Sequence, residues 1–168
     1  MLEKNWNDLI TPSNVVITAK DGDIKGTVVA EPIERGYGLT IGNSLRRVLL
    51  SSLQGAAITA IKIENVLHEF TSIPGVREDV VDLILNIKNI SVKSHIEGAS
   101  KVSLIANGPC EVTAGMIQSN ANVEIKNTDL VLCHLDKDSE LNIEFTINTG
   151  RGYSPAANNK PEDAPIGL

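Results

Sequence analysis

The sequence predicts an α+β protein. Two segments carry apolar residues at helical spacing, and most of the remaining chain consists of short apolar runs separated by turn residues. The chain has 168 residues, of which 42% are hydrophobic, which is enough for one domain or two small ones with a sizeable core. This composition is typical of a globular protein.

The first predicted element is a β-hairpin. Residues 14–18 form an apolar run, and residues 27–30 form a second one that reads as the return strand. Between them, Asp21, Gly22 and Asp23 are residue types that accept the backbone dihedrals of a tight reversal.

A long amphipathic helix is predicted next. Apolar residues recur at helical spacing and share one broad face, and these are Ile41, Leu45, Val48, Leu49 and Leu53. At 100° per residue, Arg47 falls opposite the centre of this face and Leu50 falls well to its side. A stripe this wide is more than one small sheet needs, so it predicts a helix that packs on its own sheet and on a partner.

After this helix, the sequence pattern changes to mostly short predicted strands. Gly55, Ala56 and Ala57 mark a boundary, residues 58–63 read as a strand, and residues 76–86 have the spacing of a second helix. Further strands are predicted at residues 91–96, 101–106, 122–126, 130–135 and 141–149. Residues 150–163 read as a polar loop, after which Ile166, Gly167 and Leu168 look like the start of a new apolar element.

Composition and charge exclude several classes of protein. No apolar run approaches the ~20 residues that span a bilayer, and the N-terminus does not resemble a signal peptide, so we expect a cytoplasmic protein. The net charge is −6 and the pI is about 5.0, which disfavours direct binding to nucleic acid.

No motif predicts a cofactor or a metal. The spacing of Gly36, Gly38 and Gly42 does not fit a dinucleotide fingerprint, and it indicates a tight turn and close packing at a helix instead. Asp21 and Asp23 are interpreted as turn residues and not as Mg²⁺ ligands.

The cysteines and histidines do not predict a metal site either. Cys110 and Cys133 lie far apart in the sequence and are interpreted as core residues. His134 adjoins Cys133, and alternation along a strand places their side chains on opposite faces. A zinc site formed by the cysteines and one of the three histidines would require a chance tertiary arrangement.

Several segments together resemble the bacterial RNA polymerase α subunit. The longest is Glu34-Arg35-Gly36-Tyr37-Gly38 continuing through the run from Gly42 to Ser52. Other matching stretches are Leu67 to Phe70, Gly75 to Lys88, Gly108-Pro109, Val112 to Ala114, Val131 to Leu135 and Gly150 to Tyr153. The resemblance covers nearly the whole chain in order.

The resemblance implies a discontinuous dimerisation domain, formed by the hairpin and the long helix and completed by chain that returns much later. On this basis residues 1–54 and 164–168 belong to the dimerisation domain, and residues 55–163 form an inserted, strand-rich domain. Family members continue well past the position of Leu168, so the sequence departs from the family there, and we expect a truncated dimerisation domain.

The resemblance also implies a function and a set of contact residues. The family's subunit is a non-catalytic scaffold that forms a homodimer and binds the β and β′ subunits. The implied dimerisation residues are Ile41, Leu45, Val48, Leu49 and Leu53, while Arg47 and Leu50 are implied to bind β. Lys88 and Ser154 are implied to bind β′, although family members often carry an apolar residue in place of Ser154.

One alternative remains open from the residues alone. The chain could be a small enzyme with a nucleotide or phosphate site where a helix starts at Gly42 and Asn43, because helix N-termini attract anions. A scaffold helix should be apolar on two sides, whereas an enzyme site needs a polar pocket at the helix N-terminus.

Overall fold

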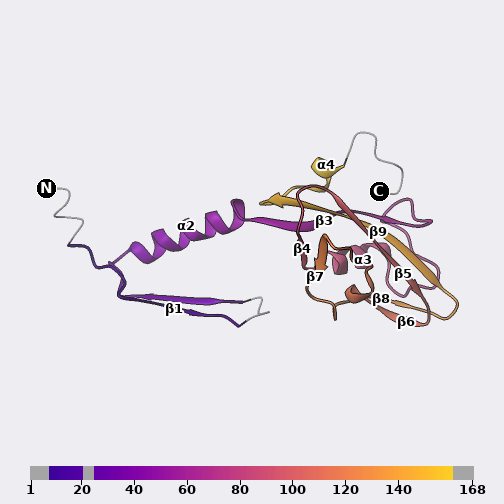
Figure 1. Cartoon of the computed structure of the whole chain (residues 1–168), viewed down its shortest axis with the longest axis horizontal. Coiled ribbons are helices and arrows are strands. Elements are labelled where there is room, and N and C mark those ends of the chain that lie inside the picture. Colours follow the sequence, from indigo (N-terminus) through magenta and orange to yellow (C-terminus); the bar gives the residue numbers. More distant parts are fainter. Residues whose placement is uncertain (1–7, 21–24, 161–168) are drawn as a thin grey trace. The chain divides into compact units, whose positions relative to one another are not determined.

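The chain combines a few helices with antiparallel strands, most of them in a run from β4 to β9, which confirms the mixed α+β class (Figure 1). The computed structural model describes residues 8–20 and 25–160. The chain divides into two compact units, Met1–Leu50 and Ser51–Leu168. Among the described residues, no helix has both the length and the apolar character needed to cross a membrane.

The first unit contains the predicted hairpin and the predicted long helix. Strands β1 (Asn14–Thr18) and β2 (Thr27–Glu31) pair antiparallel, with Ile17 opposite Val28. The predicted turn at residues 21–23 lies outside the described residues. Helix α2 (Tyr37–Ser51) follows, and it begins after Gly36, whose φ of 90° lies in the left-handed region that favours glycine.

The ends of the long helix differ from the prediction. The helix begins at Tyr37, whose backbone N–H donates to the Glu34 carbonyl at 3.1 Å, and it ends at Ser51. Leu53 therefore lies outside the helix. The next strand, β3 (Gln54–Ile63), already includes Gly55, so Gly55 is part of a strand and does not mark its boundary.

The second unit is built on a five-stranded antiparallel sheet with the order β5-β9-β3-β4-β7. Its strands besides β3 are β4 (Val92–Ser94), β5 (Ser100–Asn107), β7 (Val123–Ile125) and β9 (Glu140–Arg151). Strands β6 (Cys110–Thr113) and β8 (Val131–Leu135) form a separate two-stranded ribbon, and a short 3-10 turn, η1 (Ala114–Met116), follows β6.

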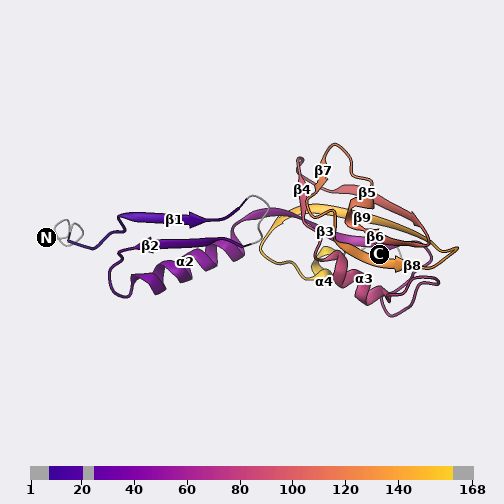
Figure 2. The ribbon, with the colours of Figure 1, turned by 90° about the horizontal axis from the view of Figure 1, so that it is seen from below.

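The predicted strands of this unit are confirmed with small shifts, and three features were not predicted. Strand β6 had not been predicted, and strand β9 extends through Gly150 and Arg151, which had been placed in a polar loop. The same loop contains a one-turn helix, α4 (Ala156–Asn159). In Figure 2, α3 (Val80–Ile87) and α4 lie on the same side of the sheet.

One apolar cluster holds the second unit together. Strands β5 and β9 are adjacent and alternate between buried and more exposed positions, so every second side chain enters the core. Leu104, Ile143 and Phe145 are fully buried there. Helix α3 covers the cluster with Val80, Leu83 and Ile87.

Helix α3 begins later than predicted. Asp79 is its N-cap, and the Asp79 side chain accepts a hydrogen bond from the Asp82 backbone N–H at 2.7 Å. Val76 fits the helical spacing but forms a β-bridge with Leu135. It follows Gly75, whose φ of 75° is incompatible with a helix.

Glu78 ties the segment before α3 to strand β8. Its carboxylate accepts hydrogen bonds from the His134 backbone N–H at 2.8 Å and from His134 Nδ1 at 2.6 Å. Burial alone would raise the pKa of Glu78, but these hydrogen bonds outweigh it and hold the pKa below its usual value.

Candidate interaction surfaces

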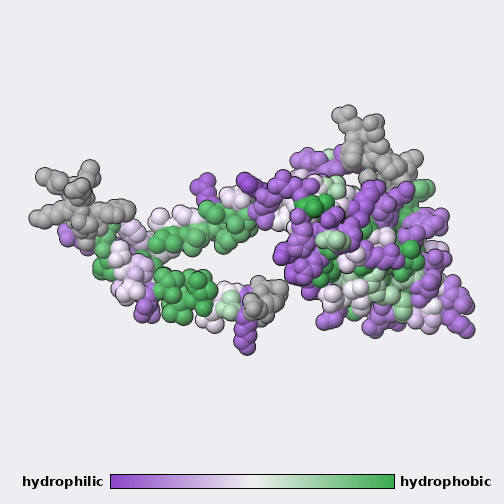
Figure 3. Space-filling view, in the orientation of Figure 1, coloured by the Kyte–Doolittle hydropathy of each residue, from purple (hydrophilic) through white to green (hydrophobic). Residues whose placement is uncertain are grey.

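Helix α2 presents an apolar face that nothing in its own unit covers. None of its side chains is buried, and Leu49 remains 59% exposed. Figure 3 shows apolar side chains along both the helix and the hairpin. The predicted contact residues Ile41, Leu45, Val48 and Leu49 share this face, whereas Leu53 is exposed but follows the helix. An exposed apolar surface of this length is a feature of proteins that associate.

Two glycines interrupt the same face near its N-terminal end. Gly38 and Gly42 lie one turn apart in α2, and at 100° per residue they fall within about 20° on either side of Leu49. A Cβ atom at either position would meet nothing within 4 Å in this chain. The glycines were predicted to allow close packing around the helix. That prediction is wrong within this unit, because no other part of the described chain packs against either glycine.

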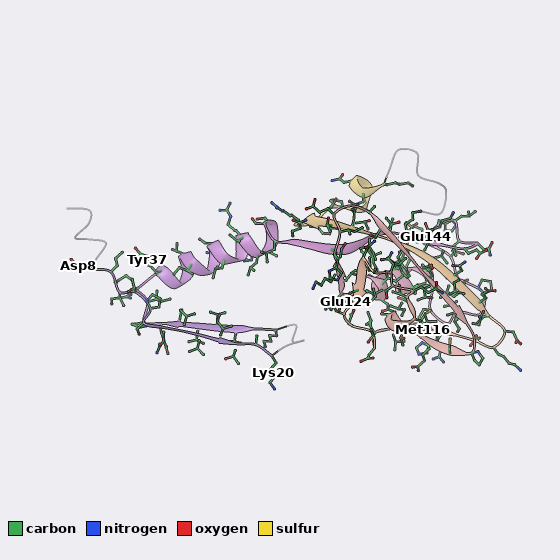
Figure 4. The ribbon with its side chains drawn as sticks, viewed as in Figure 1. Asp8, Lys20, Tyr37, Met116, Glu124 and Glu144 are labelled. Carbon is green, nitrogen blue, oxygen red and sulfur yellow. The ribbon has the colours of Figure 1, made fainter. Side chains whose placement is uncertain are left out.

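Arg47 and Leu50 lie away from the apolar face, as predicted. Both are exposed, and both are carried by the last turns of α2. Figure 4 shows side chains projecting both above and below this helix, which starts at the labelled Tyr37. The helix therefore offers two surfaces, one apolar and one containing arginine.

The structure contradicts an anion site at a helix start on Gly42. The helix begins five residues earlier, at Tyr37, so Gly42 and Asn43 lie in its interior. Their backbone N–H groups are used by the i→i−4 hydrogen bonds of the helix and cannot cradle a phosphate. The alternative of a small nucleotide-binding enzyme loses the feature on which it was based.

A second candidate surface is an open groove of about 570 Å³ in the second unit. One side is formed by helix α3 with Val81, Leu85 and Lys88, and the floor by Thr59 and Ala60 of β3. The remaining lining residues come from the loop before α3 and from the α4 region, and they are Glu69, Phe70, Ala156, Ala157, Asn159 and Lys160, with Ile84 at the base of α3.

The two predicted contact residues of the second unit relate to the groove in different ways. Lys88 lies on its rim. Ser154 does not line the groove, but its hydroxyl donates to Asn159 Oδ1 at 2.8 Å, and Asn159 is a lining residue. Lys88 therefore lines the groove directly, whereas Ser154 is linked to it through Asn159.

The described residues hold no cluster of three or more His, Cys, Asp or Glu side chains suited to a metal ion. Cys133 is fully buried, while His134 is only half-buried, as expected for neighbours on opposite faces of a strand. Burial raises the pKa of the Cys133 thiol to about 12, so this thiol stays protonated and unreactive at neutral pH.

The sequence did not reveal the groove. In the sequence, Leu67 to Phe70 served only as a stretch that matches the family. The structure shows that Phe70 is 80% exposed. A signal was available in α3, where Asp82 and Asn86 are the only polar residues among eight. A helix that is apolar nearly all round is usually covered on more than one side.

An uncovered apolar helix face and an open apolar groove are features of proteins that contact other chains. A family model described as the RNA polymerase Rpb3/RpoA insert domain matches residues 61–168, which is more than half of the chain. The chain belongs to this family of RNA polymerase subunits.

Proposed function

We propose that the chain is the α-type subunit of a bacterial DNA-dependent RNA polymerase, and that it acts as a non-catalytic scaffold. It forms a homodimer and binds β and β′ to assemble the transcription enzyme in the cytoplasm. The observation that carries this proposal is the uncovered apolar face of α2 in a chain of the polymerase subunit family.

The dimerisation surface is the apolar face of α2, formed by Ile41, Leu45, Val48 and Leu49. Leu53 extends it just beyond the helix. Two arguments support a protein partner here. Moving apolar side chains such as these from water into an interface contributes favourable free energy. Each glycine in a helix interior also costs about 1 kcal/mol relative to alanine, so Gly38 and Gly42 suit a face that another backbone approaches closely.

Arg47 and Leu50 form the proposed contact with β. Their position away from the apolar face leaves them accessible when the helix is covered by a second copy. Arginine suits such a role because its planar guanidinium can bind a carboxylate through two hydrogen bonds. One copy of the dimer binds β and the other binds β′.

The contact with β′ is proposed to include Lys88 and Ser154. Lys88 lines the groove beside α3 and Ser154 bonds to the lining residue Asn159, which supports a common surface. The dimerisation domain comprises residues 1–54 and 164–168, and the inserted domain comprises residues 55–163. Mg²⁺ and nucleoside triphosphates are handled by the partner subunits, and the chain itself needs no cofactor and makes no contact with DNA or a membrane.

The experiment is co-expression of the tagged subunit with β, followed by affinity capture and sizing. We expect a complex containing two copies of the subunit and one of β. Arg47→Ala should reduce the captured β, whereas Ile105→Ala, a change on strand β5 of the second unit, should not. Absence of β from the wild-type capture would contradict the proposal.

A further inference from the structure

Asn107 is the only asparagine in the sequence that is followed directly by a glycine. In such a dipeptide the glycine nitrogen can attack the side-chain amide carbon of the asparagine, because glycine has no side chain to hinder the approach and adopts the required backbone dihedrals readily. Asn107 is exposed at the last position of β5, so its amide is accessible to water. The chemistry of deamidation is therefore available at this position.

The fold requires the glycine that follows Asn107. A Cβ atom on Gly108 would lie 1.9 Å from the Asp136 carbonyl oxygen, which is a backbone atom. This oxygen belongs to the turn of residues 136–139, which joins β8 to β9. The same turn rests on Gly75, whose carbonyl accepts a hydrogen bond from the Asp136 N–H at 2.8 Å. A larger residue at position 108 would displace the turn, so the fold retains a dipeptide prone to deamidation.

The same turn also restrains the nitrogen that would react. The Gly108 N–H donates to the Ser139 carbonyl at 2.8 Å, and Ser139 Oγ donates to the Asp136 carbonyl within the turn. Asn107 is paired with Glu140 at the end of the β5–β9 ladder. Ring closure requires the Gly108 nitrogen to lose its proton and to rotate towards the Asn107 side chain. Both steps require the bond to Ser139 to open first.

We propose that Asn107 is a latent deamidation site controlled by the turn between β8 and β9. When the turn opens, the Gly108 nitrogen forms a bond to the Asn107 Cγ atom and the bond from Cγ to Nδ2 breaks. The proton released from the Gly108 nitrogen leaves with the amide group as ammonia. Water then opens the resulting succinimide at either carbonyl, which gives aspartate or isoaspartate. This site is independent of the contacts proposed for the scaffold function.

The product adds negative charge to a part of the chain that is already acidic. Glu140 lies opposite Asn107, and Asp136 and Asp138 belong to the adjoining turn. Like charges directly opposite each other destabilise a pair of strands. Isoaspartate also adds one carbon atom to the main chain, which disturbs the register of the pairing. Deamidation should therefore loosen the turn that restrains it and lower the melting temperature.

Peptide mapping by mass spectrometry of the full-length subunit tests this proposal, with the native protein and the guanidinium-unfolded chain incubated in parallel at mildly alkaline pH. In the unfolded chain, Asn107 should deamidate faster than Asn148, which is exposed in β9 but precedes the β-branched Thr149. In the native protein, Asn107 should react at least roughly tenfold more slowly than in the unfolded chain, because the reaction requires local opening. Methylation by a purified isoaspartyl methyltransferase with a labelled methyl donor measures the isoaspartate.

Ser139→Ala distinguishes opening of the turn from general unfolding. It removes the hydroxyl bond within the turn but keeps the backbone carbonyl that accepts from Gly108. We expect native deamidation of Asn107 to increase several-fold with Asn148 unchanged, and Asn107→Gln to abolish the isoaspartate signal of this peptide.

Equal rates at Asn107 in the native and unfolded states, or no preference for Asn107 over Asn148 in the unfolded chain, would overturn the proposal. An unchanged native rate in Ser139→Ala, or an equal acceleration at Asn148, would overturn the control by the turn.

Discussion

Replacing Leu49 with alanine removes apolar area from the centre of the α2 face without disturbing the fold of the subunit. Leu49 is not part of the buried cluster and remains 59% exposed. Alanine has the highest helix propensity, so the helix itself should persist. The effect of the substitution should therefore appear in self-association.

The magnitude follows from the exposed fraction. Complete burial of a leucine side chain contributes roughly 1.5–3 kcal/mol. Covering the exposed part of Leu49, and allowing for the methyl group that alanine retains, leaves a loss of roughly 1 kcal/mol for each protomer. A two-fold interface contains the residue twice, so the dimer should lose roughly 2 kcal/mol, or about a 30-fold increase in Kd.

Sedimentation equilibrium of the full-length subunit measures this change directly. The matched control is Leu39→Ala, because Leu39 is 76% exposed on the same helix but lies to the side of the apolar face. We expect the control to change Kd little. An unchanged Kd for Leu49→Ala, or an equal change for Leu39→Ala, would refute the assignment of this face.

Three further predictions concern single residues. Arg47→Ala should leave the free energy of unfolding within about 0.5 kcal/mol of the wild-type value. It should reduce the amount of β captured in a pull-down, because an interfacial partner left unpaired costs roughly 2–5 kcal/mol of binding free energy. Normal capture of β would exclude Arg47 from that contact. Gly42→Ala should stabilise the helix by roughly 1 kcal/mol, because nothing in the chain opposes the added methyl group, yet weaken the dimer; circular dichroism and sedimentation measure the two effects, and an unaffected dimer would argue against close approach at this glycine. Burial raises the pKa of the Cys133 thiol from 9.0 to about 12, so Cys133 should resist thiol labelling at pH 8 while Cys110 reacts, and rapid labelling of both thiols in the native protein would contradict the burial. The free energy of unfolding should also decline as pH rises from 9 towards 12, because the thiol ionises in the unfolded chain before it ionises in the folded one. Cys133→Ala should lessen that decline.

Local sequence pattern was sufficient where one face of an element is buried. Alternation along β5 and β9 places Leu104, Ile143 and Phe145 in the core, and the same pattern is visible in the sequence. The hairpin was equally readable, because its two apolar runs flank residue types typical of a turn.

Element ends were less predictable because distant contacts determine them. Gln54 and Gly55 join strand β3 by pairing with Arg151 and Gly150, almost a hundred positions later. Val76 has helical spacing, but the bridge to Leu135 holds it in an extended segment before α3. Spacing alone cannot detect a partner strand elsewhere in the chain.

The two candidate surfaces also differed in how far the sequence could predict them. The α2 face lies within one helix, so its periodicity was visible in the sequence. The groove combines Phe70, helix α3 and the α4 region, which are separated by many residues and meet only after folding. The sequence therefore predicted Lys88 and Ser154 through resemblance, but not the apolar lining between them.

Stepwise assembly of the full-length subunit with purified β and then β′, followed by mass measurement of each intermediate, tests the scaffold function most directly. The account predicts a homodimer, then a complex with one β, and then a complex with one β and one β′. Leu49→Ala should impair the first step and Arg47→Ala the second. Formation of the β–β′ complex at the same rate and yield without the subunit would contradict the account.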